Sequence, residues 1–140
     1  MGRDVTHIVE QIRRFEPVQE DWSALDRLLQ ELFRTDEASL GVRAILGIFE
    51  RFPAHDGFGV FWSAVHGLES LSGYELALIE SVRQAPAMFS LRMIRRILNS
   101  GVSEVAGVRL LELVREVVRR DDVSRDVRDA AQDILDDFVV

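Results

Sequence analysis

The stretch ASLGVRAILGIFERFPAHDGFGVFWSAVHGLESL, residues 38–71, contains the features that decide the fold. Apolar residues recur every three or four positions on both sides of its centre, which is the period of an amphipathic helix. Pro53 stops the first helix, and Gly57 can adopt the positive φ that a tight turn needs. The pattern predicts a helix from about residue 37 to residue 51, a turn, and a helix from residue 58 to about residue 71.

The rest of the chain repeats this helix–turn–helix pattern, and no stretch alternates convincingly as a strand does. We expect about eight helices with short connections, which form antiparallel hairpins of about 35 residues each in a single domain spanning residues 1–140. The other helices are expected at residues 4–15, 22–33, 73–85, 87–99 and 103–120, and from residue 122 or 124 to residue 138.

Local signals predict individual helix ends and faces. Ser72 and Glu75 have the spacing of a capping box, so Ser72 is expected to cap the fifth helix. That helix is expected to bury Leu76 together with Ile79 and Val82, and the third helix is expected to bury Leu40 among its apolar positions.

Hairpins of this length either stack as a short α-solenoid or pack as an irregular bundle. The stretch SRDVRDAAQDIL, residues 124–135, loosely resembles the second helix of a HEAT repeat, and VRAIL, residues 42–46, is a weaker match. The predicted fold class is therefore all-α, with a HEAT-like short α-solenoid and an irregular helical bundle both left open.

Composition excludes several classes of function. Cysteine is absent, and all 17 basic residues are arginine, so cysteine nucleophiles, thiolate metal sites and lysine Schiff bases are excluded. The net charge of −7 disfavours a nucleic-acid partner and favours a cationic one. The N-terminal stretch lacks the apolar run of a signal peptide, and no apolar stretch is long enough to span a membrane, so a cytoplasmic protein without a membrane partner is expected.

Charge is unevenly distributed along the chain. Residues 1–82 hold 14 acids and 7 arginines, residues 83–120 hold 3 acids and 8 arginines, and residues 121–140 hold 7 acids and 2 arginines. Either neighbouring helices neutralise one another, or the acidic segments face a basic partner. The same choice applies to an acidic stripe on the last helix, which is either a solvated face or a contact surface for a basic partner. Its members are Asp126, Asp129, Asp133, Asp136 and Asp137.

No catalytic site is predicted. His55 and Asp56 resemble the dyad of metal phosphohydrolases, but the other histidines lack a metal-ligand spacing to them. We interpret His55-Asp56-Gly57 as a turn in which Asp56 caps the next helix. Ser63 and His66 lie one helical turn apart without a nucleophile elbow. A non-enzyme without cofactor or metal is expected, and a metal-dependent hydrolase that uses His55, Asp56 and His66 is the alternative.

The helix after the turn is predicted to have three faces. Its core face carries Phe61, Ala64, Val65, Leu68 and Leu71, and a stripe of small residues, which lets a neighbouring helix approach closely, carries Val60, Ser63, Gly67 and Ser70. Trp62, His66 and Glu69 share the third face, because they are spaced four and three residues apart. This face either packs on the next hairpin or forms an exposed patch typical of a protein–protein hot spot.

The stretch FERFPAHDGFGVFWSAVHGLE and its continuation GYELALIESVRQAPAMFSLRMIRRILNSG carry a family resemblance. Together, residues 49–101 resemble small bacterial helical proteins of polymorphic-toxin loci that are regarded as HEAT-like immunity proteins. The resemblance implies a protein that binds a cognate toxin domain and blocks its active site or substrate approach.

We therefore expect an immunity protein that neutralises a cationic toxin domain by steric and electrostatic occlusion. Acidic side chains would pair with toxin arginines or lysines, and Trp62 or Tyr74 would be the apolar anchor. A non-catalytic scaffold or adaptor for another protein partner is the alternative. The predicted partner-binding residues are Asp56, Phe58, Trp62, His66, Glu69, Tyr74, Glu75 and Glu80.

Overall fold

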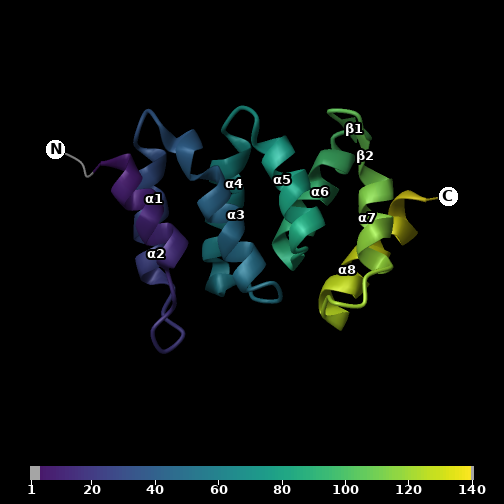
Figure 1. The fold of residues 1–140 in the computed structure, drawn as a ribbon, viewed down its shortest axis with the longest axis horizontal. Coiled ribbons are helices and arrows are strands. Elements are labelled where there is room, and N and C mark those ends of the chain that lie inside the picture. Colours follow the sequence, from purple (N-terminus) through teal and green to yellow (C-terminus); the bar gives the residue numbers. More distant parts are fainter. Residues whose placement is uncertain (1–3, 140) are drawn as a thin grey trace.

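A computed structural model describes residues 4–139 of the chain, and eight α-helices account for most of them. The helices pair as four consecutive antiparallel hairpins (Figure 1). Their bounds are α1 Val5–Arg14, α2 Ser23–Phe33, α3 Val42–Arg51, α4 Val60–Glu69, α5 Tyr74–Gln84, α6 Met88–Asn99, α7 Leu110–Val118 and α8 Arg125–Phe138. Short 3-10 helices, η1 Ala38–Gly41 and η2 Gly57–Gly59, precede α3 and α4, and strands β1 Glu104–Val105 and β2 Val108–Arg109 precede α7.

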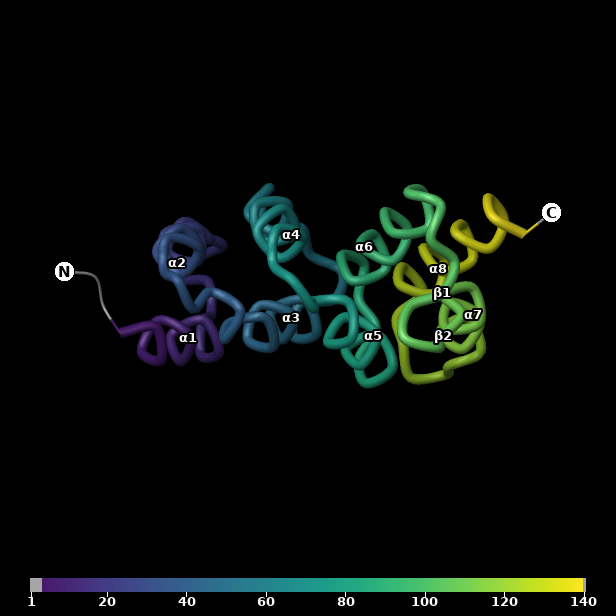
Figure 2. Tube along the Cα trace, turned by 90° about the horizontal axis from the view of Figure 1, so that it is seen from above, coloured from purple at the N-terminus to yellow at the C-terminus, as the bar shows by residue number. Residues whose placement is uncertain are grey.

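The hairpins stack side by side in two layers. Helices α1, α3, α5 and α7 follow one another in the first layer, and α2, α4, α6 and α8 follow one another in the second (Figure 2). Each hairpin packs mainly against the next hairpin along the chain, and the two ends of the chain lie far apart. This nearest-neighbour arrangement is that of a short α-solenoid, which decides between the two architectures that the sequence leaves open.

Buried aromatic rings occupy the centre of the stack. Phe49 of α3, Phe61 of α4 and Phe89 of α6 contact one another, with ring centroids 5.2 to 5.8 Å apart, and all three side chains are buried. The apolar faces of all eight helices continue this core in both directions. The predicted core face of α4 is confirmed, because Phe61, Ala64, Val65 and Leu68 are all buried.

The turns within the four hairpins lie along one edge of the stack, which we call the turn edge (Figure 1). Hydrogen bonds join neighbouring turns there. The backbone N–H of Met88 donates to the carbonyl oxygen of Pro53 at 2.8 Å. The Arg120 guanidinium donates through Nη1 to the carbonyl oxygen of Arg83 at 2.6 Å. The turn edge is therefore held together by contacts between hairpins as well as within them.

The predicted start of the seventh helix at Ser103 is wrong. Residues 104–109 form a β-hairpin in which Glu104 pairs with Arg109, and α7 begins only at Leu110. Its two loop residues, Ala106 and Gly107, have φ of 50° and 82°. Positive φ at both positions is the requirement of a type I′ hairpin turn, so the Ala-Gly pair between valines favours a hairpin over a helix.

Three details of the fifth and third helices also differ from the prediction. Gly73, at φ 80°, occupies the N-cap of α5 without a side-chain hydrogen bond, so Ser72 does not cap this helix. Leu76 is 54% exposed, because α5 buries Leu78 beside Ile79 and Val82 instead. Leu40 is 56% exposed, because it lies in η1 rather than in a regular continuation of α3.

Candidate functional site

The turn after α3 is built by its own side chains. The Asp56 carboxylate accepts a hydrogen bond from the Phe58 backbone N–H at 2.9 Å, so Asp56 caps the short helix η2 that follows it, whereas α4 itself has Gly59 at its N-cap. Gly57 has φ +61°, and a Cβ at this position would lie 2.5 Å from the Phe61 ring. Only glycine fits here, because both the conformation and the lack of space exclude a side chain.

His55 connects this turn to the preceding hairpin. Its Nδ1 accepts a hydrogen bond from the Gly57 backbone N–H at 2.7 Å, so the ring proton belongs on Nε2, which lies 3.1 Å from Oε2 of Glu20. The ring also packs on Trp22, with centroids 4.7 Å apart. Both ring nitrogens therefore have structural partners, in agreement with the interpretation of His55-Asp56-Gly57 as a turn.

The residues of the alternative hydrolase site are not assembled into a metal site. His66 lies on the exposed face of α4, in the neighbourhood of Trp62 rather than of Asp56. Among residues 4–139, no three histidine, aspartate or glutamate side chains come together in a group that could hold a metal ion.

Phe58 is the most unusual residue of the turn. Its backbone is left-handed, with φ 51° and ψ 45°, and its side chain is 70% exposed. For a residue other than glycine, this conformation costs roughly 1–2 kcal/mol. Within residues 4–139, its one aromatic contact is a T-shaped arrangement with the His55 ring, at a centroid distance of 5.6 Å. Internal packing therefore does not account for a large apolar ring at this position, and strained residues of this kind cluster at functional sites.

Trp62 combines the two roles that the sequence left open. Its ring meets Phe89 of α6 edge-on at a centroid distance of 5.2 Å, yet the residue is 37% exposed. The Arg92 guanidinium lies 5.8 Å from the Trp62 ring and 4.6 Å from the Phe89 ring, within cation–π range. His66 continues this exposed face, with its ring 6.2 Å from that of Trp62.

Glu69 and Tyr74 form a separate group at the other end of α4. The Arg96 guanidinium holds Glu69 through two hydrogen bonds of 2.8 and 2.9 Å. Burial raises the pKa of the Tyr74 hydroxyl, and the nearby charges of Glu69 and Glu75 raise it further. Glu69 is thus already paired within the chain, in the bidentate geometry that arginine and carboxylate prefer.

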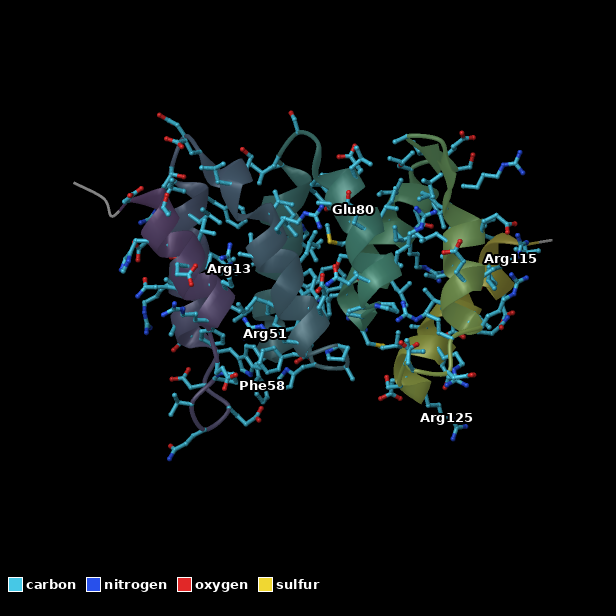
Figure 3. The ribbon with its side chains drawn as sticks, viewed as in Figure 1. Arg13, Arg51, Phe58, Glu80, Arg115 and Arg125 are labelled. Atoms are coloured by element: carbon cyan, nitrogen blue, oxygen red, sulfur yellow. The ribbon has the colours of Figure 1, made fainter. Side chains whose placement is uncertain are left out.

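Glu80 lies apart from the other predicted residues. It is on α5, in the first layer, where its carboxylate pairs with Arg43 of α3. Figure 3 shows Glu80 part-way along α5, whereas Phe58 lies at the turn edge. The structure therefore brings Asp56, Phe58, Trp62 and His66 along one side of the second layer. It places Glu69, Tyr74 and Glu75 near the far end of α4, where α5 begins, and it separates Glu80 from both groups.

The sequence reasoning missed the contribution of α6. A hollow of about 340 Å³ opens beside the turn, and Met88, Phe89 and Arg92 of α6 form its wall opposite Asp56 and Phe58. Within residues 4–139, Arg92 forms no ion pair, so its charge is available at this surface. We call Asp56, Phe58, Trp62, His66 and Arg92 the recognition ridge. Sequence alone places Arg92 on a polar face of its helix, without indicating which neighbour that face meets.

No helix in residues 4–139 has the length and apolar character needed to cross a membrane.

Comparisons leave the family of the chain undetermined. Comparison of the chain with protein-family models, with curated proteins and with solved structures finds no match.

Proposed function

We propose that the chain is an immunity protein that binds a cationic toxin domain through the recognition ridge and blocks it without chemistry. The observation that carries this proposal is Phe58, a large apolar side chain exposed on a strained backbone. An exposed aromatic residue surrounded by polar groups is typical of a binding hot spot. The resemblance of residues 49–101 to immunity proteins supplies the kind of partner.

The ridge provides complementary contacts around this anchor. Phe58 inserts into an apolar pocket of the partner, and the exposed edge of Trp62 extends the apolar contact. Asp56 uses one carboxylate oxygen for the turn and keeps the other for a cationic group of the partner. Arg92 makes the ridge mixed in charge, so the partner surface has an acidic or aromatic group facing α6.

The net charge acts at longer range than the ridge. A chain of net charge −7 attracts a cationic domain and accelerates encounter, and this steering weakens as salt is added. The apolar anchor then determines how slowly the complex dissociates. We expect the association rate to depend on ionic strength and the dissociation rate to depend on Phe58.

Neutralisation in a bacterial host tests this proposal. The candidate toxin, taken from the reading frame beside this one, is expressed with and without the chain, and survival and binding affinity are measured. Phe58→Asn removes the ring and keeps a residue type that tolerates the left-handed backbone, so it is expected to weaken binding at least about tenfold and to abolish protection.

Leu40→Asn is the matched control. Leu40 is also exposed and apolar, but it lies at the opposite end of α3, away from the ridge. It is expected to bind the toxin like wild type. Equal affinity of wild type and Phe58→Asn would contradict the proposed surface. A stable complex with a non-toxic cellular protein, with no protection against the neighbouring gene product, would favour the adaptor function instead.

A further inference from the structure

A second hollow lies next to the recognition ridge, between α6 and α8. Its volume is about 370 Å³, and its floor is apolar. The floor residues are Met88 and Leu91 of α6 and Ala130 and Ile134 of α8. The two walls carry opposite charge, with Arg92 and Arg95 on α6 facing Asp126, Asp129 and Asp133 on α8.

One of the two arginines on the positive wall, Arg95, is neutralised by the chain itself, whereas two of the three aspartates on the negative wall are not. Arg95 pairs with Asp137 of α8, and its guanidinium lies 5.7 Å from the Phe138 ring. Asp129 approaches Arg125 only at 3.7 Å, in an exposed pair of the kind that contributes little. No ion pair within residues 4–139 compensates Asp126 or Asp133. The hollow is therefore net negative over an apolar floor.

The hollow is continuous with the recognition ridge. Met88 and Arg92 line it and also line the hollow beside Phe58. A partner that contacts Phe58 would therefore extend past Arg92 to reach α8. Because Arg92 is positively charged, a cationic group of this partner binds the acidic α8 wall rather than the α6 wall.

We propose that the α6–α8 groove binds an arginine-bearing segment of the partner protein. Guanidinium groups bind the carboxylates of Asp126 and Asp133, and apolar parts of the segment cover the floor at Leu91 and Ile134. Arginine fits better than lysine, because its planar fork pairs with carboxylates in bidentate fashion and is more weakly hydrated. This inference rests on the proposed function and gives a specific role to Asp126 and Asp133 of the acidic stripe of α8.

A peptide titration tests the groove without the toxin. The full ¹⁵N-labelled chain is titrated with hexa-arginine, acetylated and amidated at its ends, at low salt. We expect the largest backbone shifts at Leu91, Ala130 and Ile134. Asp126→Asn/Asp133→Asn is expected to weaken peptide binding about fivefold. The control Asp121→Asn/Asp136→Asn removes the same charge outside the groove lining and is expected to stay within about twofold of wild type.

Two outcomes would contradict the proposal that the groove binds an arginine-bearing segment. One is equal weakening by both double variants, since binding would then follow net charge alone. The other is shifts spread over the acidic residues of α1 to α3 without a maximum between α6 and α8. Failure of the proposed function looks different, because the peptide would still bind in the groove while the neighbouring toxin remained active.

Discussion

The guanidinium of Arg51 at the end of α3 donates through Nη1 to the carbonyl oxygen of Phe15 at 2.8 Å, just after α1 ends. Its Nη2 donates to the carbonyl oxygen of Ile12 at 3.2 Å. Arg120, after α7, does the same for the end of α5 at Arg83. In both places an arginine at or just after the end of a first-layer helix donates to backbone carbonyls at the end of the preceding first-layer helix, where carbonyl groups lack a full set of helical partners. The device recurs at an interval of two hairpins.

Arg51→Lys is therefore expected to destabilise the fold although it keeps the charge. One ammonium does not reproduce the fork that reaches both Phe15 and Ile12, so we expect a loss of about 1 kcal/mol in the free energy of unfolding. Urea unfolding measures it, with the midpoint falling and the slope unchanged. Arg13→Lys is the control, because among the described residues Arg13 bonds only to Glu10, on the exposed side of α1, and a change within about 0.5 kcal/mol is expected. Equal stability of Arg51→Lys and wild type would show that the carbonyl contacts contribute nothing.

Gly67→Ala is expected to separate α4 from α2. A Cβ at Gly67 would lie 2.1 Å from atoms of the Phe33 ring, as predicted for the small-residue stripe that admits a close neighbour. The overlap outweighs the gain in helix propensity, so unfolding free energy is expected to fall by about 1–2 kcal/mol.

Gly47→Ala is expected to raise the free energy of unfolding, in contrast to Gly67→Ala. Gly47 lies within α3, and a Cβ there meets no atom within 4 Å. We expect a gain of about 0.5–1 kcal/mol from propensity alone. Thermal unfolding of the two variants checks both signs, and a stabilised Gly67→Ala would mean that Phe33 moves aside without cost.

Much of the fold follows from local sequence. Apolar spacing and Pro53 determine where α3 and α4 lie, and the same spacing places Trp62 and His66 on one face. Where turn-forming residues lie within an apolar pattern of helical period, the apolar spacing alone predicts the wrong element. Ala106 and Gly107 form a hairpin turn inside a stretch whose valines also fit a helical period.

The candidate site is less predictable because it joins different hairpins. Periodicity identifies a polar face for α6 but does not determine how α6 is rotated against α4. The position of Arg92 near the Trp62 ring and the pairing of Arg96 with Glu69 both depend on that rotation. The sequence predicts that a helix begins at Phe58, whereas Phe58 adopts the left-handed conformation within η2 and α4 begins at Val60.

Asp122→Asn is expected to change how stability depends on pH. A hydrogen bond from Arg120 lowers the pKa of the Asp122 carboxyl below its ordinary value. A lowered folded-state pKa contributes stability above the unfolded-state pKa, and this contribution is lost as pH falls through the folded value. Wild type should therefore exceed the variant in urea midpoint near pH 7, and the difference should close as pH falls below about 4.

The neighbouring acid provides the control for this titration. Asp121 forms no ion pair within residues 4–139, so the difference in urea midpoint between Asp121→Asn and wild type is expected to stay constant across the same pH range. A constant difference between Asp122→Asn and wild type from neutral to acid pH would refute a role for the Arg120 pair.

Phe58→Asn is expected to raise stability while it removes recognition. Asparagine tolerates the left-handed backbone, which relieves part of the roughly 1–2 kcal/mol cost of Phe58. Within residues 4–139, removing the ring eliminates one aromatic contact, the T-shaped contact with His55. At an exposed position this contact contributes little to the free energy of unfolding. The melting temperature should rise by roughly 3 °C. Phe58→Ala separates the two effects, because alanine keeps the strain and loses the ring, so its melting temperature should not rise. If the melting temperature of Phe58→Asn fell by a similar amount instead, the Phe58 ring would contribute to packing within the turn.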